Sequence, residues 1–172
     1  MSEIDVRPLR VADVPAVLAV QAQCYEPQFL ESAQAFEAKL KAVQAHDTCW
    51  IATDGDGQPL AYVLSLPASP DSLPALDASS AELPAQPQLL YLHDLAVAPA
   101  GRSMGLARQL VALIEQRASQ LGLRQLGLVA VQGSVPFWRR HGFETLSHLP
   151  QALALKLASF GAEACFMQRA LR

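Results

Sequence analysis

Residues that could bind an anion follow an apolar segment in the middle of the chain. The apolar residues of YLHDLAV predict a strand that carries His93, with one face formed by Tyr91, Leu95 and Val97. Pro99 and Gly101 then predict a turn. After Gly105 the apolar spacing becomes helical, at Leu106, Leu110, Leu113 and Ile114. The segment therefore predicts a strand and a tight turn that lead into an amphipathic helix.

The turn before this helix suits a phosphate group. The first N–H groups of a helix lack acceptors within the helix, and the helix dipole adds positive charge there. Gly105 and Ala107 have little or no side chain, so an anion can approach the backbone closely, and Arg102 supplies a forked cationic donor. The sequence therefore predicts a site for a pyrophosphate.

Two common phosphate motifs are absent from the sequence. It contains no G-x-x-x-x-G-K-[ST] and no G-x-G-x-x-G. The pattern R-x-x-G-x-A at 102–107, which follows V-x-P, resembles the acetyl-CoA-binding signature of the GNAT acyltransferase superfamily. The segment SVPFWRRHGF at 134–143 resembles the second signature of that superfamily, a short helix with an aromatic pair that ends in Gly-Phe.

This resemblance implies an enzyme with acetyl-CoA as the acyl donor. In the GNAT fold the two central strands, here 89–98 and 125–131, splay apart, and the donor lies in the wedge between them. The resemblance implies donor contacts along the first strand, in the phosphate turn and in the short helix, at Leu95, Ala96, Val97, Arg102, Ser103, Met104, Gly105, Leu106, Ala107, Ser134, Phe137 and Trp138.

Within the superfamily, the stretches 92–97 and 135–143 are most similar to serotonin (arylalkylamine) N-acetyltransferases. His93 lies at the position that matches a catalytic histidine of that family, which implies a general base. An amine acceptor is mostly protonated at neutral pH and must lose a proton before it attacks, and imidazole has an unperturbed pKa of about 6.5. The alternative is a hydrogen-bonded core histidine.

Trp138 departs from the family pattern, which has a tyrosine there as proton donor to the departing thiolate. An indole N–H does not dissociate at useful pH, so the acid role does not carry over. Tyr91, predicted on the same strand face as His93, could supply the proton, or the thiolate could leave unassisted. Trp138 is then expected to line the site, with packing alone as the alternative.

The acceptor site is expected at a break between two predicted helices. CYEP at 24–27 interrupts the helical pattern, and Tyr25 and Phe29 are predicted acceptor contacts together with Trp138 and Asp94. Asp94 should face away from His93 unless a bulge turns it. The segment 67–87 holds five prolines and is expected to be a loop that caps the site.

The remaining patterns complete an α/β (α+β) fold. Strands are predicted at 3–9, 48–53, 60–66, 143–147 and 165–171, and helices from Asp13 onward, at 29–45 and at 136–141, whereas 149–161 is ambiguous. This order matches the GNAT fold, a mixed central sheet of about six to seven strands flanked by helices. We expect a single domain over residues 1–172.

The composition and net charge of the chain limit the classes of partner that are expected. The chain has 172 residues, 51% hydrophobic and 17% charged, with a net charge of -3 and a pI near 5.8, so neither nucleic acid nor an anionic membrane is expected as a partner. Three scattered cysteines predict reduced, buried thiols, without a disulfide framework or a metal site. No signal-peptide or membrane-spanning pattern is present, so a cytoplasmic location is expected.

The leading hypothesis is N-acetylation of a small-molecule primary amine by direct attack in a ternary complex, by a monomer or homodimer that needs no metal. One alternative is acetylation of a protein N-terminus or lysine. Another is a non-catalytic acyl-CoA-binding regulatory module. The acceptor surface of this fold comes from variable loops, so the sequence does not select among amines.

Overall fold

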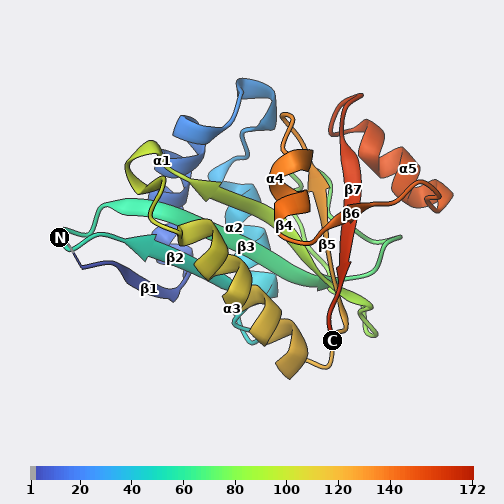
Figure 1. Cartoon of the computed structure of the whole chain (residues 1–172), viewed down its shortest axis with the longest axis horizontal. Coiled ribbons are helices and arrows are strands. Elements are labelled where there is room, and N and C mark those ends of the chain that lie inside the picture. The colour runs from blue at the N-terminus through green and yellow to red at the C-terminus, as the bar shows by residue number, and fades with distance from the viewer. Residues whose placement is uncertain (1–2) are drawn as a thin grey trace.

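The computed structural model describes residues 3–172, which contain one seven-stranded sheet in the order β1-β2-β3-β4-β5-β7-β6 (Figure 1). The strands are β1 (Asp5–Pro8), β2 (Cys49–Thr53), β3 (Pro59–Ala68), β4 (Leu89–Val97), β5 (Gln125–Ala130), β6 (Glu144–Thr145) and β7 (Cys165–Ala170). Within the described chain β4 and β5 are the parallel pair, and the other pairs are antiparallel. The sheet is therefore mixed, as predicted.

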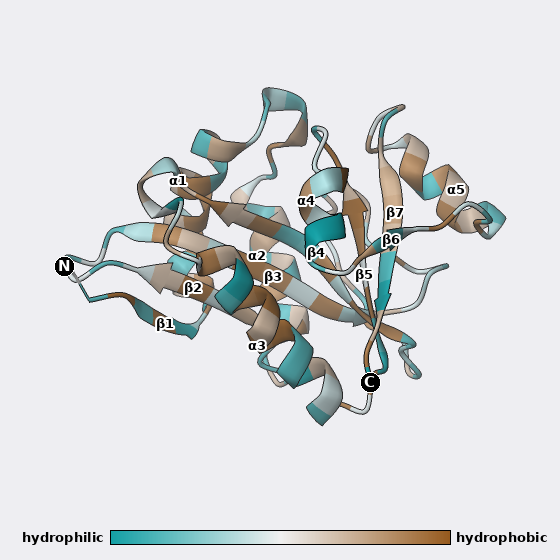
Figure 2. Ribbon diagram, in the orientation of Figure 1, coloured by the Kyte–Doolittle hydropathy of each residue, from teal (hydrophilic) through white to brown (hydrophobic). Residues whose placement is uncertain are grey.

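Helices cover both faces of the sheet (Figure 1). They are α1 (Val14–Cys24), α2 (Ala33–Ala42), α3 (Leu106–Gln120), α4 (Val135–Arg140) and α5 (Gln151–Ala158), with short 3-10 turns η1 (Val11–Asp13), η2 (Pro27–Phe29) and η3 (Pro99–Gly101). One core packs α1, α2 and α5 on the sheet, and the other packs α3 and α4 on the opposite face. In Figure 2 the apolar colour runs along the central strands, whereas α3 alternates between polar and apolar segments.

Two helix starts differ in detail from the sequence prediction. Asp13 holds the N-cap position of α1, but its carboxylate accepts two hydrogen bonds of 2.8 Å from the Arg7 guanidinium and one of 2.9 Å from the Arg10 backbone. Helix α2 begins at Ala33 and not at Phe29, because the Ser32 side chain accepts the N–H of Ala35 and caps the helix there.

The C-terminal elements were predicted less completely. The ambiguous segment 149–161 contains α5, with Leu153 buried and Leu157 largely so. Strand β6 is two residues long, shorter than the predicted 143–147. Ser134 stands before α4 without a side-chain capping hydrogen bond, and that helix starts one residue earlier than predicted.

The three cysteines are free thiols, and the predicted burial holds for one of them. Cys49 is buried, whereas Cys24 and Cys165 are partly buried. Over residues 3–172, none of the helices combines the length and the apolar character needed to cross a membrane.

Candidate active site

A bulge in β4 shapes the centre of the site. Leu64 of β3 pairs with Asp94 and Ser65 pairs with Leu92, so His93 has no opposite residue in the ladder. One extra residue reverses the alternation of faces beyond it. Tyr91 therefore packs in the core with α1 and α2, whereas Leu95 and Val97 pack on the face of α3. The predicted single face for Tyr91, Leu95 and Val97 is wrong for this reason.

The parallel strands β4 and β5 separate just beyond this level. Their pairing runs from Leu90 with Leu126 to Leu92 with Leu128, although β4 continues to Val97. The backbone of β4 beyond Leu92 therefore has a strand partner on the β3 side while β5 diverges. The splay expected between the two central strands is confirmed.

A cleft of about 280 Å³ opens where the strands separate. Its lining includes twelve of the predicted site residues, namely Tyr25, Phe29, His93, Asp94, Leu95, Ala96, Val97, Arg102, Ala107, Ser134, Phe137 and Trp138. The cleft thus joins the turn before α3 to the bulge in β4. Trp138 is largely buried at its wall, with its ring 4.9 Å from that of Phe137 and 5.4 Å from that of Phe143.

Five other predicted residues lie outside the lining of this cleft, as the described chain defines it. Tyr91 and Leu106 are buried in the two cores, and burial raises the pKa of Tyr91. Ser103, Met104 and Gly105 belong to the turn before α3, where the Met104 side chain is 52% exposed. Contact of these three with a donor phosphate stays a prediction.

The turn before α3 fits the predicted anion. Gly105 has a φ of 73°, a left-handed conformation that favours glycine, and a Cβ at this position would meet nothing within 4 Å. The space beside the backbone is therefore open. The backbone groups at the start of α3, together with Arg102 in the cleft wall, supply the donors that a pyrophosphate requires.

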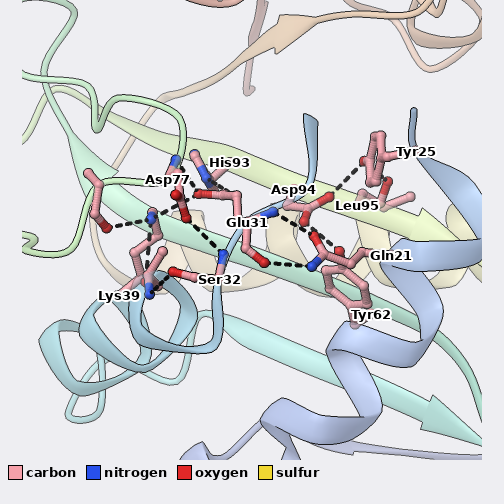
Figure 3. Close-up of polar contacts among 12 residues, drawn as sticks. Gln21, Tyr25, Glu31, Ser32, Lys39, Tyr62, Asp77, His93, Asp94 and Leu95 are labelled. Carbon is pink, nitrogen blue, oxygen red and sulfur yellow. Dashed lines mark hydrogen bonds and ion pairs between the residues drawn. The ribbon is translucent and has the colours of Figure 1, made fainter. Parts of the chain in front are cut away.

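His93 meets a buried carboxylate that the sequence analysis did not identify. Its Nε2 lies 2.7 Å from Oε1 of Glu31, and Oε2 of Glu31 accepts from Nζ of Lys39 at 3.2 Å and from the backbone N–H of Asp77 at 2.8 Å (Figure 3). Burial alone would raise the pKa of Glu31. The charge and hydrogen bond of His93 and the Lys39 ammonium outweigh burial and lower this pKa to about 2.

Asp94 lies on the other side of the bulge between two phenols. Tyr25 donates to its Oδ1 at 2.7 Å and Tyr62 to its Oδ2 at 2.5 Å, and the Tyr25 hydroxyl also lies 3.0 Å from the carbonyl of Leu95 (Figure 3). Burial raises the pKa of Asp94 to about 6 against these hydrogen bonds, which lower it. The site therefore places a carboxylate of unusually high pKa next to His93.

Two loops meet at the wall of the cleft. Oε1 of Gln132, just after β5, accepts the backbone N–H of Glu26 at 2.7 Å, and its Nε2 donates to the carbonyl of Cys24 at 3.3 Å. Leu76, from the proline-rich loop 69–88, also lines the cleft. The predicted helix break and the predicted capping loop thus both contribute to the site wall.

One sequence signal could have revealed the Glu31 pair. Lys39 lies at helical spacing from Phe36 and Val43, which places a lysine on the buried face of α2 and calls for an anionic partner. Nothing in the local sequence identifies Glu31 as that partner. Gln132 carries no sequence signal either, because its contacts are more than a hundred residues distant along the chain.

The splayed parallel pair, the bulge and the glycine turn before α3 are the arrangement expected of the GNAT fold. The chain belongs to the acetyltransferase (GNAT) family, which matches residues 14–143. The superfamily predicted from the two sequence signatures is thereby confirmed. No curated protein matches the sequence significantly.

Several solved structures share the fold. A GphF GNAT-like decarboxylase in complex with isobutyryl-CoA has 19% identity over 98% of this chain and 100% of its own, with a TM-score of 0.74. The paia N-acetyltransferase from Thermoplasma acidophilum, in complex with coenzyme A, has 14% identity over 98% and 99% and a TM-score of 0.65. The ribosomal-protein-S18-alanine N-acetyltransferase from Escherichia coli has 15% identity over 98% and 94% and a TM-score of 0.64. Two of these proteins were solved with an acyl-CoA or coenzyme A bound, and the likeness of this chain to all three lies in the fold.

Proposed function

We propose that this acyltransferase moves the acetyl group of acetyl-CoA to the primary amine of a small molecule, by direct attack in a ternary complex. The observation that carries the proposal is a single cleft with Arg102 and Ala107 at one end and His93 and Asp94 at the other. A phosphate-binding end and a proton-accepting end are what a CoA-dependent N-acetylation needs in one cavity.

In this proposal the chain's own residues perform three tasks. The turn before α3 and Arg102 bind the pyrophosphate, and the β4 backbone beyond Leu92 binds the pantetheine arm along the splay. His93 accepts the proton that the amine loses as its nitrogen bonds to the acetyl carbon. The C–S bond of the thioester then breaks, and the thiolate leaves without a phenol at Trp138, because thiols are more acidic than amines.

One feature supports a small acceptor over an extended peptide, and a second supports a cationic acceptor. Gln132 forms hydrogen bonds to the backbone of Cys24 and Glu26 and so joins two loops at the cleft. Leu76 of the loop 69–88 lines the cleft as well. Both contacts narrow the approach to the bulge. Asp94, with a pKa of about 6, is mostly ionised at neutral pH and attracts an ammonium group.

Three further parts of the proposal come from the sequence. We place the chain nearest to the serotonin N-acetyltransferase-like members on the stretches 92–97 and 135–143. A single domain over 1–172, a cytoplasmic location and a monomeric or homodimeric state complete it. Each stays a prediction.

A panel of acceptors tests the function. The full chain is incubated with acetyl-CoA and aryl amines, aliphatic amines, or peptides with free N-termini and lysines, and release of the free thiol is followed. Thiol release with small amines, absent when the amine is omitted, supports the proposal. Release with peptides alone overturns the acceptor class, and tight acetyl-CoA binding without release on either panel overturns the enzymatic role.

A further inference from the structure

The two ring nitrogens of His93 lie in different environments. Nε2 is 2.7 Å from Oε1 of Glu31, and both side chains are almost wholly buried, 1% and 3% exposed (Figure 3). Nδ1 of His93 is buried as well, and among the described residues it has no hydrogen-bond partner. The proposed function gives His93 a task but gives Glu31 none.

Glu31 is held by three separate segments (Figure 3). The Gln21 side chain of α1 donates to its backbone carbonyl at 2.6 Å and accepts its N–H at 3.1 Å. Lys39 of α2 and the backbone of Asp77 in the loop 69–88 both donate to its Oε2. These donors leave Oε1 directed at His93, and with two donors on Oε2 the carboxylate is held in its ionised form.

We infer that Glu31 is a positioning residue that fixes the tautomer of His93 and makes Nδ1 the proton-accepting atom. An ionised carboxylate only accepts hydrogen bonds, so Nε2 must carry a proton in the neutral and in the charged imidazole. The proton that leaves the amine therefore bonds to Nδ1, and the imidazolium keeps its Nε2–H bond to Glu31. This inference rests on the proposed function in its choice of His93 as the base.

The parent protein provides the first test, without any variant. Nitrogen-15 NMR of the histidine rings distinguishes protonated from unprotonated nitrogens, and the His93 signals are assigned by their loss in His93→Gln. We expect neutral His93 to carry its proton on Nε2. A proton on Nδ1 would overturn the inference whatever the activity of the enzyme.

Glu31→Gln should reverse the tautomer. Lys39 and the Asp77 N–H both donate at the Oε2 position, so the amide oxygen belongs there and the amide NH₂ faces His93. That NH₂ donates to Nε2, which must then be unprotonated, and the proton moves to Nδ1. We expect kcat/KM for the amine to fall on the order of 10-fold to 10²-fold, and the rising limb of the pH–rate profile to move to lower pH because the negative charge is lost.

Two variants test whether Glu31 positions His93 directly or acts only by anchoring the loop 69–88. Glu37→Gln makes the same change on α2 outside these contacts and should keep the tautomer and the profile of the parent. Lys39→Met removes the ammonium but leaves the Glu31 bond to His93, so the Nε2–H tautomer should persist. If Lys39→Met and Glu31→Gln change the tautomer alike, Glu31 acts only through the loop and the inference is wrong.

Different outcomes would contradict the role of Glu31 and the role of His93. If His93→Ala loses activity while Glu31→Gln keeps the parent's tautomer and profile, the role of Glu31 is overturned and the proposed function stands. If His93→Ala keeps the parent's activity, His93 is not the base, and the proposed function and the use of Nδ1 fail together. If Glu31→Gln does not fold, the tautomer of His93 in the parent protein still tests the role of Glu31.

Discussion

His93 shows how much a single inserted residue determines at this site. Because His93 is the extra residue of the β4 bulge, its side chain and that of its neighbour Asp94 can bond to partners on the same side of the sheet, whereas regular alternation would direct them to opposite faces. Glu31 and Tyr25 then bind them from the α1–α2 side. A histidine and a carboxylate of raised pKa thereby lie next to each other on one strand.

Replacement of His93 by alanine tests whether its imidazole is the general base. We expect His93→Ala to lower kcat/KM for the amine on the order of 10²-fold at pH 7, and by less at higher pH, where the amine is already deprotonated. Affinity for acetyl-CoA should change little. The measurement is thiol release as a function of pH. A variant with the parent's pH–rate profile would return His93 to the role of a core histidine.

The aromatic residue at 138 is expected to act by packing and not as an acid. Trp138→Phe should keep the pH–rate profile and lower the free energy of unfolding by roughly 1–3 kcal/mol, because ring contacts with Phe137 and Phe143 are lost. Denaturant titration and steady-state rates measure the two effects.

Trp138→Tyr adds the missing phenol at this position and is the sharper case. If protonation of the thiolate limits turnover, the rate should rise, and combination with Tyr91→Phe shows whether the two phenols share a role. We expect additive, small effects, since Tyr91 lies in the core and its pKa is raised. A strong loss in Tyr91→Phe that Trp138→Tyr rescues would assign the acid to Tyr91.

At the scale of elements, the strand-turn-helix unit of β4 and α3 was predictable from local signals. Gly105 and the helical spacing after it locate the start of α3 correctly, and Pro99 marks the end of β4. The bulge was not predictable, because two-residue alternation gives no sign of an inserted residue until the β3 register is known. Local patterns thus predicted the turn before α3 better than the bulge in β4.

A negatively charged side chain in the open space of the turn before α3 tests whether this turn binds the donor phosphates. Gly105→Glu should abolish acetyl-CoA binding while the protein stays folded, because the added carboxylate repels the phosphates where the backbone must approach them. Gly57→Glu is the matched control. Gly57 also has a positive φ, 81°, and an open Cβ position, but it lies in the β2–β3 turn.

Isothermal calorimetry with acetyl-CoA compares the two variants. Both carry the strain of a left-handed non-glycine residue, on the order of 1–3 kcal/mol, so strain alone would affect them alike. Lost affinity in Gly105→Glu with retained affinity in Gly57→Glu supports the assignment. Equal affinities in two folded variants would place the donor phosphates elsewhere.

At the scale of the whole molecule, contacts distant in sequence complete the part of the cleft around His93. Glu31 meets His93 and Asp77, and Gln132 meets Glu26, only because the sheet order brings α1, α2 and the loop 69–88 over the splay. The order of elements and the mixed sheet followed from periodicity and the family signatures. The partners of a buried carboxylate could not follow from them, since they depend on three-dimensional packing.

Two buried carboxylates of this site should change the stability of the protein in opposite directions as the pH rises. Glu31 has its pKa lowered from 4.5 to about 2, so its contribution is present above pH 4.5 and is lost as pH falls through about 2. Asp94 has its pKa raised from 3.8 to about 6, so its ionisation reduces stability as pH rises across that interval. Each shift corresponds to roughly 3 kcal/mol. These two groups together favour greatest stability near pH 4 to 5.

Asp94→Asn isolates the second effect. The amide cannot ionise, so the free energy of unfolding of the variant minus that of the parent should rise by roughly 3 kcal/mol between about pH 4 and about pH 7. Altered hydrogen bonds to Tyr25 and Tyr62 add an offset that is nearly constant over this range, because both phenols have pKa values well above it. Urea titrations at several pH values measure the difference, and Asp56→Asn, in the exposed β2–β3 turn, is the control whose curve should stay parallel to that of the parent. Parallel curves for Asp94→Asn as well would mean that Asp94 titrates as it does in the unfolded chain, and the site would then lack a carboxylate of raised pKa beside His93.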